Sequence, residues 1–195
     1  LAVEGGVKAT ATSGNLPRRT VEALYDKLPL DAYERESTDR FCKVKNEQDV
    51  HLLHQARITC EAARLIQKRK GVFIITKAGR AMRKPENIGS LYRALFIAYF
   101  RINSLAYFDR RADQLTCIQD TLPVILWRLS LVARDWTDLE ILSHQTLLPY
   151  AFDHVMQYED SHSYLKKGEI MEYRVWCHLH QFGLLEAAPI NEDGN

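Results

Sequence analysis

The sequence has no long hydrophobic run. Its longest uninterrupted apolar stretch, Ala94–Phe100, has seven residues, whereas a helix that spans a bilayer needs about 20. A leader of basic and then apolar residues, which would direct secretion, is not evident at the start. We therefore expect a cytoplasmic protein that makes no contact with a membrane.

Cysteine is scarce and shows no pairing pattern. The chain has four cysteines, Cys42, Cys60, Cys117 and Cys177, and they form no C-x-x-C motif. A chain of 195 residues can bury a core without disulfide bonds. We expect free thiols in a reducing compartment.

The common nucleotide-binding and hydrolase signatures are missing as well. Neither G-x-x-x-x-G-K-[ST], G-x-G-x-x-G, G-x-S-x-G nor H-E-x-x-H occurs. His51 and His54 are three residues apart on a predicted helix, but no clear third and fourth ligand follows at a suitable spacing. Cys177 and His180 lack an orienting group and an oxyanion element. We predict no enzyme activity, no metal and no cofactor.

The chain also lacks an excess of one charge, because 26 Lys and Arg residues stand against 25 Asp and Glu residues. This balance hides two segments of opposite sign. Residues 57–84 hold nine basic residues and one acidic residue, a net charge of +8. Residues 135–195 hold eleven acidic and three basic residues, a net charge of −8. The asymmetry suggests a polyanionic partner for the first half, or halves that complement each other within a molecule or between subunits.

A helix followed by a basic hairpin is the clearest local pattern. Asn46 can cap a helix that runs to about Ala63. Residues 65–69 and 72–76 then predict two strands around Lys70-Gly71, and Thr76 can cap a short helix. This order is typical of a winged helix, in which the helix is the recognition element and the hairpin is the wing.

Other patterns complete the first half. They predict a strand over residues 7–12, a helix over 17–27, an irregular charged connection over 31–45 that can include a short helical turn, and a long apolar helix over 87–108. Residues 109–113 are a polar break. We therefore place a winged-helix-like domain at 1–110 and a second, acidic domain at 111–195, incomplete at its C-terminus.

The second half repeats this plan. Its periodicity predicts a helix over 115–132 with a break near Leu122, a helix over 137–147 opened by a capping box, and a helix over 169–182 stopped by Gly183. The capping box pairs Thr137 with Glu140, and residues 149–167 show no steady period. Residues 184–188 resemble a strand and residues 191–194 a hairpin turn. When the two halves are aligned, Arg64 of the first copy stands at the position of Gly183 in the second copy, so the repeat is imperfect. We predict a mainly α chain with short β-hairpins and a tandem winged-helix-like (α+β) architecture; the alternative is one irregular helical domain.

Several short motifs resemble those of a known family. They are Gly6, Lys8 and Thr10, then Gly14-Asn15-Leu16-Pro17, then Arg69-Lys70-Gly71, then Thr76, Gly79 and Arg80, with Phe182 to Glu186 near the end. On these residues the chain resembles an uncharacterised bacterial family named after a plasmid open reading frame. The resemblance implies a helical, winged-helix-like region and no established activity. Residues 74–82 also resemble a strand-to-helix signature of bacterial winged-helix regulators.

Two functional hypotheses follow. The first is a regulator that binds double-stranded DNA with the helix from Asn46 and the basic hairpin. Its candidate contacts are His51, His54, Gln55, Arg57, Lys68, Arg69, Lys70, Arg80, Arg83 and Lys84. We expect the histidines and Gln55 on the outer side of the helix and residues 68–70 at an exposed tip. If Arg57, Lys68, Arg69, Lys70 and Arg83 do not share a face, this first hypothesis is much weaker. The second hypothesis is a protein-interaction module, whose acidic half docks a partner or a sister subunit without DNA binding.

Overall fold

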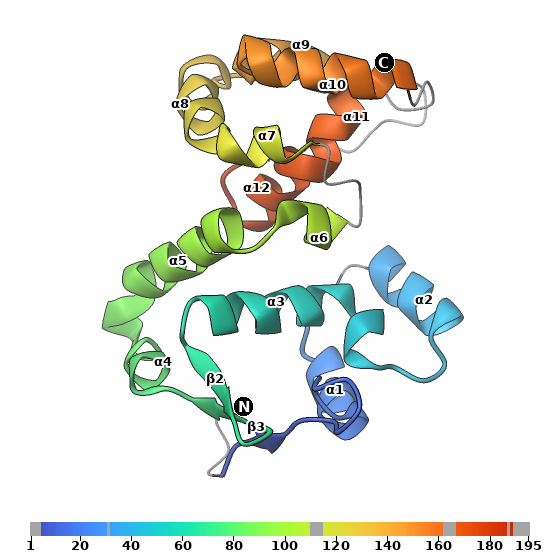
Figure 1. Ribbon diagram of the computed structural model, residues 1–195, viewed down its shortest axis with the longest axis vertical. Coiled ribbons are helices and arrows are strands. Elements are labelled where there is room, and N and C mark those ends of the chain that lie inside the picture. The colour runs from blue at the N-terminus through green and yellow to red at the C-terminus, as the bar shows by residue number, and fades with distance from the viewer. Residues whose placement is uncertain (1–4, 31, 110–114, 162–166, 187, 189–195) are drawn as a thin grey trace. The chain divides into compact units, whose positions relative to one another are not determined.

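The computed structural model describes residues 5–30, 32–109, 115–161, 167–186 and 188 (Figure 1). The chain forms two compact units, residues 1–103 and residues 104–195. The predicted boundary between residues 110 and 111 falls on residues that the structure does not describe. Within the described residues, every helix is too short or too polar to cross a membrane.

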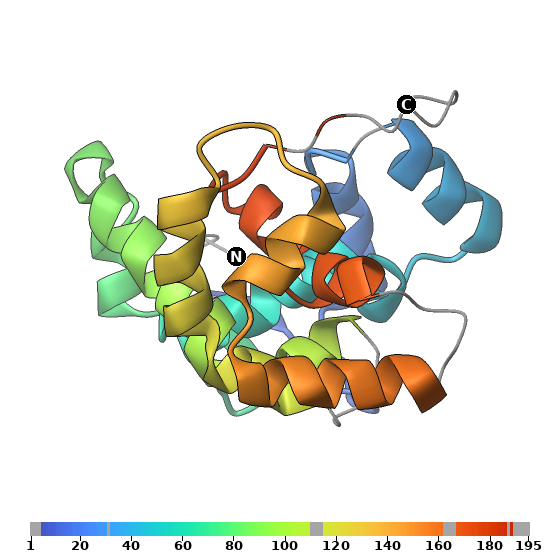
Figure 2. The ribbon, with the colours of Figure 1, turned by 90° about the horizontal axis from the view of Figure 1, so that it is seen from above.

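The first unit is mainly helical with one small sheet. In chain order it contains β1 (Val7–Lys8), α1 (Arg18–Tyr25), α2 (Ala32–Phe41), a 3-10 turn (Glu47–Asp49), α3 (His51–Ala62), β2 (Ile66–Arg69), β3 (Val72–Ile75), α4 (Lys77–Ala81), a second 3-10 turn (Pro85–Asn87), α5 (Ile88–Ile97) and a π-helical turn (Ala98–Ile102). The three strands pair antiparallel in the order β1-β3-β2. The predicted mainly α fold with a β-hairpin is confirmed. Figures 1 and 2 both place α2 and α4 beyond opposite ends of α3.

The core of the first unit lies between α1, α3 and the sheet. Its buried residues are Leu16, Val21, Tyr25, Val50, Leu53 and Phe73. Phe73, at the centre of β3, has no exposed surface. Because side chains alternate along a strand, its neighbours Val72 and Ile74 face the other side of the sheet. The hairpin is therefore part of the core, as the hydrophobic run in β3 predicts.

The hairpin and α4 form as predicted, and their joints are tight. Lys70 and Gly71 have φ angles of 48° and 74°, positive at both positions as a two-residue hairpin turn requires. Thr76 caps α4, since its hydroxyl accepts a hydrogen bond of 2.9 Å from the Gly79 backbone NH. A side chain on Gly79 would collide with the Leu65 carbonyl oxygen, at 2.1 Å from an added Cβ. Glycine at this position lets α4 pack directly on the start of β2.

Four predictions for the first unit are wrong in detail. The strand predicted over residues 7–12 ends at Lys8, because the chain folds back where the Thr10 amide donates to the Asn15 carbonyl at 2.8 Å. The charged connection of residues 31–45 contains α2. A 3-10 turn separates Asn46 from α3. The helix predicted over 87–108 is interrupted at Asn103.

The second unit consists of helices in the residues described. They are α6 (Leu105–Asp109), α7 (Thr116–Asp120), α8 (Leu122–Val132), α9 (Leu139–Thr146), α10 (Pro149–Ser161), α11 (Lys167–Met171), a π-helical turn (Glu172–Trp176) and α12 (Cys177–Gln181). They can be followed by colour in Figure 2. The break at Thr121 and the helix stop at Gly183 confirm those two predictions.

Buried apolar side chains from successive helices build the second core. They include Ile118, Ile125, Leu142, Ala151, Val155, Met171, Val175 and Leu179. An ion pair between Arg174 and Asp109 is buried with them. Arg174 is only 1% exposed, so its charge needs that carboxylate.

The second unit corrects three predictions. Asp138, not Thr137, caps α9, with its carboxylate accepting from the Glu140 and Ile141 amides at 2.8 and 3.2 Å. Residues 149–161 form α10 despite their weak periodicity. Leu184–Glu186 and Ala188 are not strand, so the described residues contain no start of a second wing. The predicted hairpin turn at 191–194 lies outside the described residues.

Candidate nucleic-acid interface

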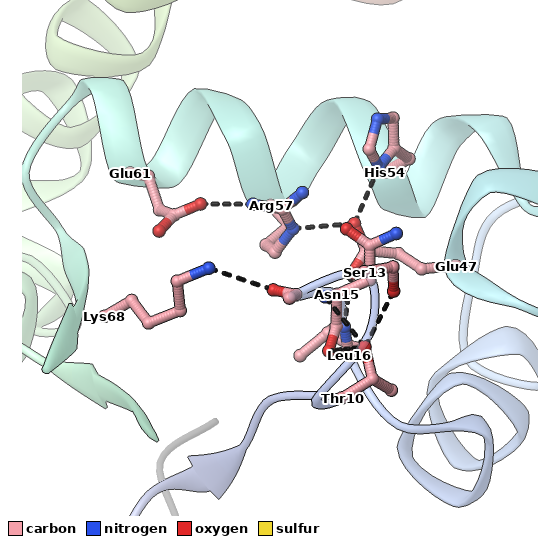
Figure 3. A network of polar contacts seen from close by, with 10 residues as sticks. Thr10, Ser13, Asn15, Leu16, Glu47, His54, Arg57, Glu61 and Lys68 are labelled. Carbon is pink, nitrogen blue, oxygen red and sulfur yellow. Dashed lines mark hydrogen bonds and ion pairs between the residues drawn. The ribbon is translucent and has the colours of Figure 1, made fainter. Parts of the chain in front are cut away.

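Three side chains of α3, those of His54, Arg57 and Glu61, belong to a polar network around Glu47 (Figure 3). Glu47 is 1% exposed. Its carboxylate lies 2.6 Å from His54 Nδ1 and accepts a hydrogen bond of 2.6 Å from Arg57 Nε. His54 is 7% exposed and Gln55 3%, so the prediction that they line the outer side of the helix is wrong.

Two further predicted contact residues are held by other groups. His51 is exposed, and its Nε2 lies 2.9 Å from the side-chain nitrogen of Gln55. Arg57 also pairs with Glu61, so two carboxylates surround its guanidinium. This pairing follows from the spacing of the residues. His54 and Arg57 are three residues apart and lie on one side of α3, and the 3-10 turn brings Glu47 to the same side. The positive charge of Arg57 is neutralised within the unit.

The same network fastens the loop that precedes α1. The other oxygen of Glu47 accepts a hydrogen bond of 2.6 Å from the Leu16 amide. Lys68 donates to the Gly14 carbonyl at 3.1 Å, and Thr10 Oγ1 accepts from the Asn15 amide at 3.0 Å (Figure 3). The motif Gly14-Asn15-Leu16-Pro17 is therefore a structural element, which joins the loop to α3 and to β2.

The basic residues do not share one face, which weakens the hypothesis that all of them contact DNA together. The register pairs Lys68 with Phe73 and Arg69 with Val72. The Lys68 ammonium and the Arg57 guanidinium each lie 5.5 Å from the centre of the Phe73 ring, on the side of the sheet that faces α3. Arg69, one residue further along β2, points to the opposite side. The residues 68–70 are therefore not a single charged tip.

The outer side of the hairpin carries a second group of cations around a hollow of about 430 Å³, which we call the basic hollow. Its charged lining residues are Arg69, Lys77, Arg80 and Arg83, and all four are exposed. The remaining lining residues are Gly5, Gly6, Gln67, Ile74, Ile75 and Thr76. Of the described residues that line it, none is acidic. In the described part of the chain no ion pair involves any of these four cations.

The walls of the basic hollow are held in place by backbone contacts. The Thr76 hydroxyl donates to the Arg64 carbonyl at 2.8 Å, and the Thr76 amide to the Leu65 carbonyl at 3.0 Å. Arg80 Nη1 donates to the Ile75 carbonyl at 3.1 Å. A Cβ on Gly6 would lie 2.4 Å from the Phe73 carbonyl, so only glycine lets the chain pass this close to β3. These contacts hold the backbone of α4 and the Arg80 side chain against the hairpin.

Three predicted contact residues, Arg69, Arg80 and Arg83, line the basic hollow. Lys70 is exposed at the hairpin turn, and Lys84 is exposed with its Nζ 3.9 Å from a Glu86 oxygen. Lys77 was not among the predicted contacts, although it belongs to the basic segment. Its position in the sequence could have identified it. Lys77 is the first residue of α4, and Gly79 lets this helix pack against the start of β2.

Metal ligands and cysteine thiols are the other groups to consider in the described part of the chain. No three His, Cys, Asp or Glu side chains come together there as a metal site requires. Burial raises the pKa of the Cys177 thiol to about 11, with the nearby charge of Glu172 adding to the effect. Burial also raises the pKa of Cys60 and Cys117. These three thiols are protonated near neutral pH and are poor nucleophiles.

The comparison with protein families covers the region that holds the Glu47 network and the basic hollow. The model of the Y4jL N-terminal domain matches residues 1–88. Over these residues the chain is similar to the Y4jL N-terminal domain. The family is named after the plasmid open reading frame y4jL, which confirms the predicted resemblance. Neither the comparison with curated proteins nor that with solved structures gives a match.

The match divides the first unit into two parts. The Y4jL domain includes β1 to α4 and ends at the start of α5, so the basic hollow lies entirely inside it. The matched region also contains Gly14-Asn15-Leu16-Pro17 and its anchor Glu47. The structure thus gives these residues of the Y4jL domain a role in folding, which is separate from the cations of the hollow.

Proposed function

We propose that the Y4jL domain of this chain binds nucleic acid through the basic hollow. The observation that carries the proposal is the arrangement of Arg69, Lys77, Arg80 and Arg83 around one hollow whose described lining contains no acid. Exposed arginines and lysines whose charge is not neutralised by a carboxylate bind phosphates and release the counterions condensed on the nucleic acid. Four like charges gathered on a fixed surface repel one another, so an anionic ligand stabilises the arrangement.

The order of the elements supports the same proposal. Helix α3 precedes the hairpin β2–β3, to which β1 adds a third strand. This is the order expected of a winged helix, in which a hairpin beside a helix contacts nucleic acid, and it supports the proposal. In this proposal the outer face of the hairpin, together with α4, makes the contact. Helix α3 is a scaffold, because its polar residues are bonded inside the unit.

The test is binding of the whole chain to a labelled mixed-sequence duplex of about 20 base pairs, followed by fluorescence anisotropy at low salt. The hollow variant carries Arg69→Gln, Lys77→Gln and Arg83→Gln; Arg80 is kept because it bonds to the Ile75 carbonyl. The matched control carries Arg19→Gln, Lys27→Gln and Lys43→Gln. These residues are also exposed, and the changes remove the same charge from α1 and from the segments that follow α1 and α2.

We expect the hollow variant to bind about tenfold or more weakly and the control variant to stay within about threefold of the unchanged chain. Equal losses in both variants would mean attraction by net charge alone. If the unchanged chain does not bind at low salt, the proposal is wrong, and the protein-interaction hypothesis for the acidic second half becomes the better one.

A further inference from the structure

The helix expected to read bases offers few groups for that task. Of the polar residues on α3, Gln55 and His54 are buried, and Arg57 is paired with two carboxylates. The exposed positions of α3 are His51, whose ring contacts Gln55, and Ala56. Sequence readout in a groove needs two to four free side chains that reach base edges, so α3 is poorly suited to it.

The basic hollow itself is suited to phosphates and not to bases. Three of its cations are arginines, whose planar forks match phosphate oxygens. The Thr76 hydroxyl is already used within the unit, as donor to Arg64 and as acceptor from Gly79. Of the described residues lining the hollow, none is aromatic. Proteins that hold single strands rely on aromatic side chains as stacking platforms.

We infer that the basic hollow binds the sugar–phosphate backbone of duplex DNA without reading its sequence. This inference rests on the proposed function and adds the form of the ligand to it. Duplex DNA presents about one negative charge every 1.7 Å of axis, so a surface of fixed cations gains more from a duplex than from a flexible single strand. A single strand would recover that difference only by stacking, for which the described lining offers no ring.

The experiment measures the affinity of the whole chain for several unrelated duplexes of about 20 base pairs and for each of their single strands, between about 50 and 200 mM salt. We expect the duplexes to bind within about threefold of one another and each single strand to bind about fivefold or more weakly. If all four cations meet phosphates, the slope of log K against log salt is about −3.6, and Arg69→Gln or Arg83→Gln alone makes it shallower by about 0.9.

A variant of α3 separates the two modes of binding. His51→Ala should leave the affinity for every duplex unchanged, because this side chain lies outside the basic hollow. A preference of about tenfold or more among the duplexes, abolished by His51→Ala, would overturn the inference while leaving nucleic-acid binding intact. Equal or tighter binding of single strands would overturn it as well. Absence of any binding would refute the proposed function along with it.

Discussion

Arg64 and Gly183 both have a positive φ angle just after the ends of two helices. Their φ angles are 56° and 68°. In each case the next amide bonds back five residues, from Leu65 to the Cys60 carbonyl and from Leu184 to the Leu179 carbonyl, both at 2.9 Å. The two residues that align in the sequence therefore end their helices with the same hydrogen bond. Among the described residues, a strand follows Arg64 but none follows Gly183.

The first prediction concerns this shared helix end. A residue with a Cβ pays about 1 kcal/mol to adopt a positive φ, whereas glycine adopts it freely. Arg64→Gly should raise the free energy of unfolding by up to about 1 kcal/mol, and Gly183→Ala should lower it by about the same amount. An added Cβ at Gly183 has no atom within 4 Å, so strain in φ alone is at work. Urea unfolding followed by circular dichroism measures both changes; a lower free energy of unfolding for Arg64→Gly, or a higher one for Gly183→Ala, would contradict this account.

The second prediction concerns the buried carboxylate of Glu47. Its two oxygens serve Leu16, His54 and Arg57, so Glu47→Gln removes the negative charge from a site that holds an arginine. We expect a loss of about 3 kcal/mol in the free energy of unfolding. Glu22→Gln is the control, because Glu22 forms an exposed pair with Arg18 at 2.7 Å and should cost less than about 0.5 kcal/mol. Similar small losses in both variants would show that Glu47 does not fasten the loop to α3.

The third prediction concerns Phe73, the central residue of β3. It is fully buried, and the cations of Arg57 and Lys68 lie over its ring. Phe73→Ala should lower the free energy of unfolding by about 3–5 kcal/mol. Phe41→Ala is the matched control, since Phe41 is 77% exposed and its loss should be close to neutral. An unchanged melting temperature for Phe73→Ala would show that the hairpin does not contribute to the core.

The fourth prediction uses the raised pKa of Cys177. At pH 8 a thiol with a pKa of about 11 is about 0.1% thiolate, so iodoacetamide should modify Cys177 very slowly in the folded chain. The rate should rise about tenfold for each pH unit up to that pKa. Peptide mass spectrometry after timed alkylation gives the rate at each cysteine. Urea-unfolded chain is the control, in which all four cysteines should react alike; rapid labelling of Cys177 in the folded chain near neutral pH would contradict its raised pKa.

Local chemistry in the sequence determined several elements before any packing is considered. The turn at Lys70-Gly71 needs positive φ angles, Thr76 has a hydroxyl at the position that caps α4, and Pro123 cannot continue a helix from the residues before it. Each of these features depends on one residue and its nearest neighbours, and each forms as predicted. The basic segment itself could also be found by counting charges.

Helix α2 shows why other elements could not be found in this way. Its sequence is highly charged and has no clear apolar stripe, so its stability comes from partners outside it. The Tyr25 hydroxyl donates to Asp39 at 3.1 Å, Arg35 donates to the Leu28 carbonyl at 3.2 Å, and Lys45 pairs with Asp39 at 2.8 Å. The hydrogen bond from Lys45 is the main reason that the pKa of Asp39 lies below its ordinary value. These contacts join residues from three segments, and no periodicity encodes them.

The tertiary structure also separates the basic residues that are neutralised inside the unit from those that remain available to a ligand. The sequence alone determined that nine basic residues lie close together along the chain. It does not distinguish those whose charge is neutralised in the fold from those that can bind a ligand. Only the fold decides which of them keep their charge available, because Glu47 comes back to neutralise Arg57, and strand alternation sends Lys68 toward Phe73 and Arg69 to the outer face. Charge is fixed by residue type, whereas its availability depends on which carboxylates and carbonyls the folded chain brings within hydrogen-bonding distance.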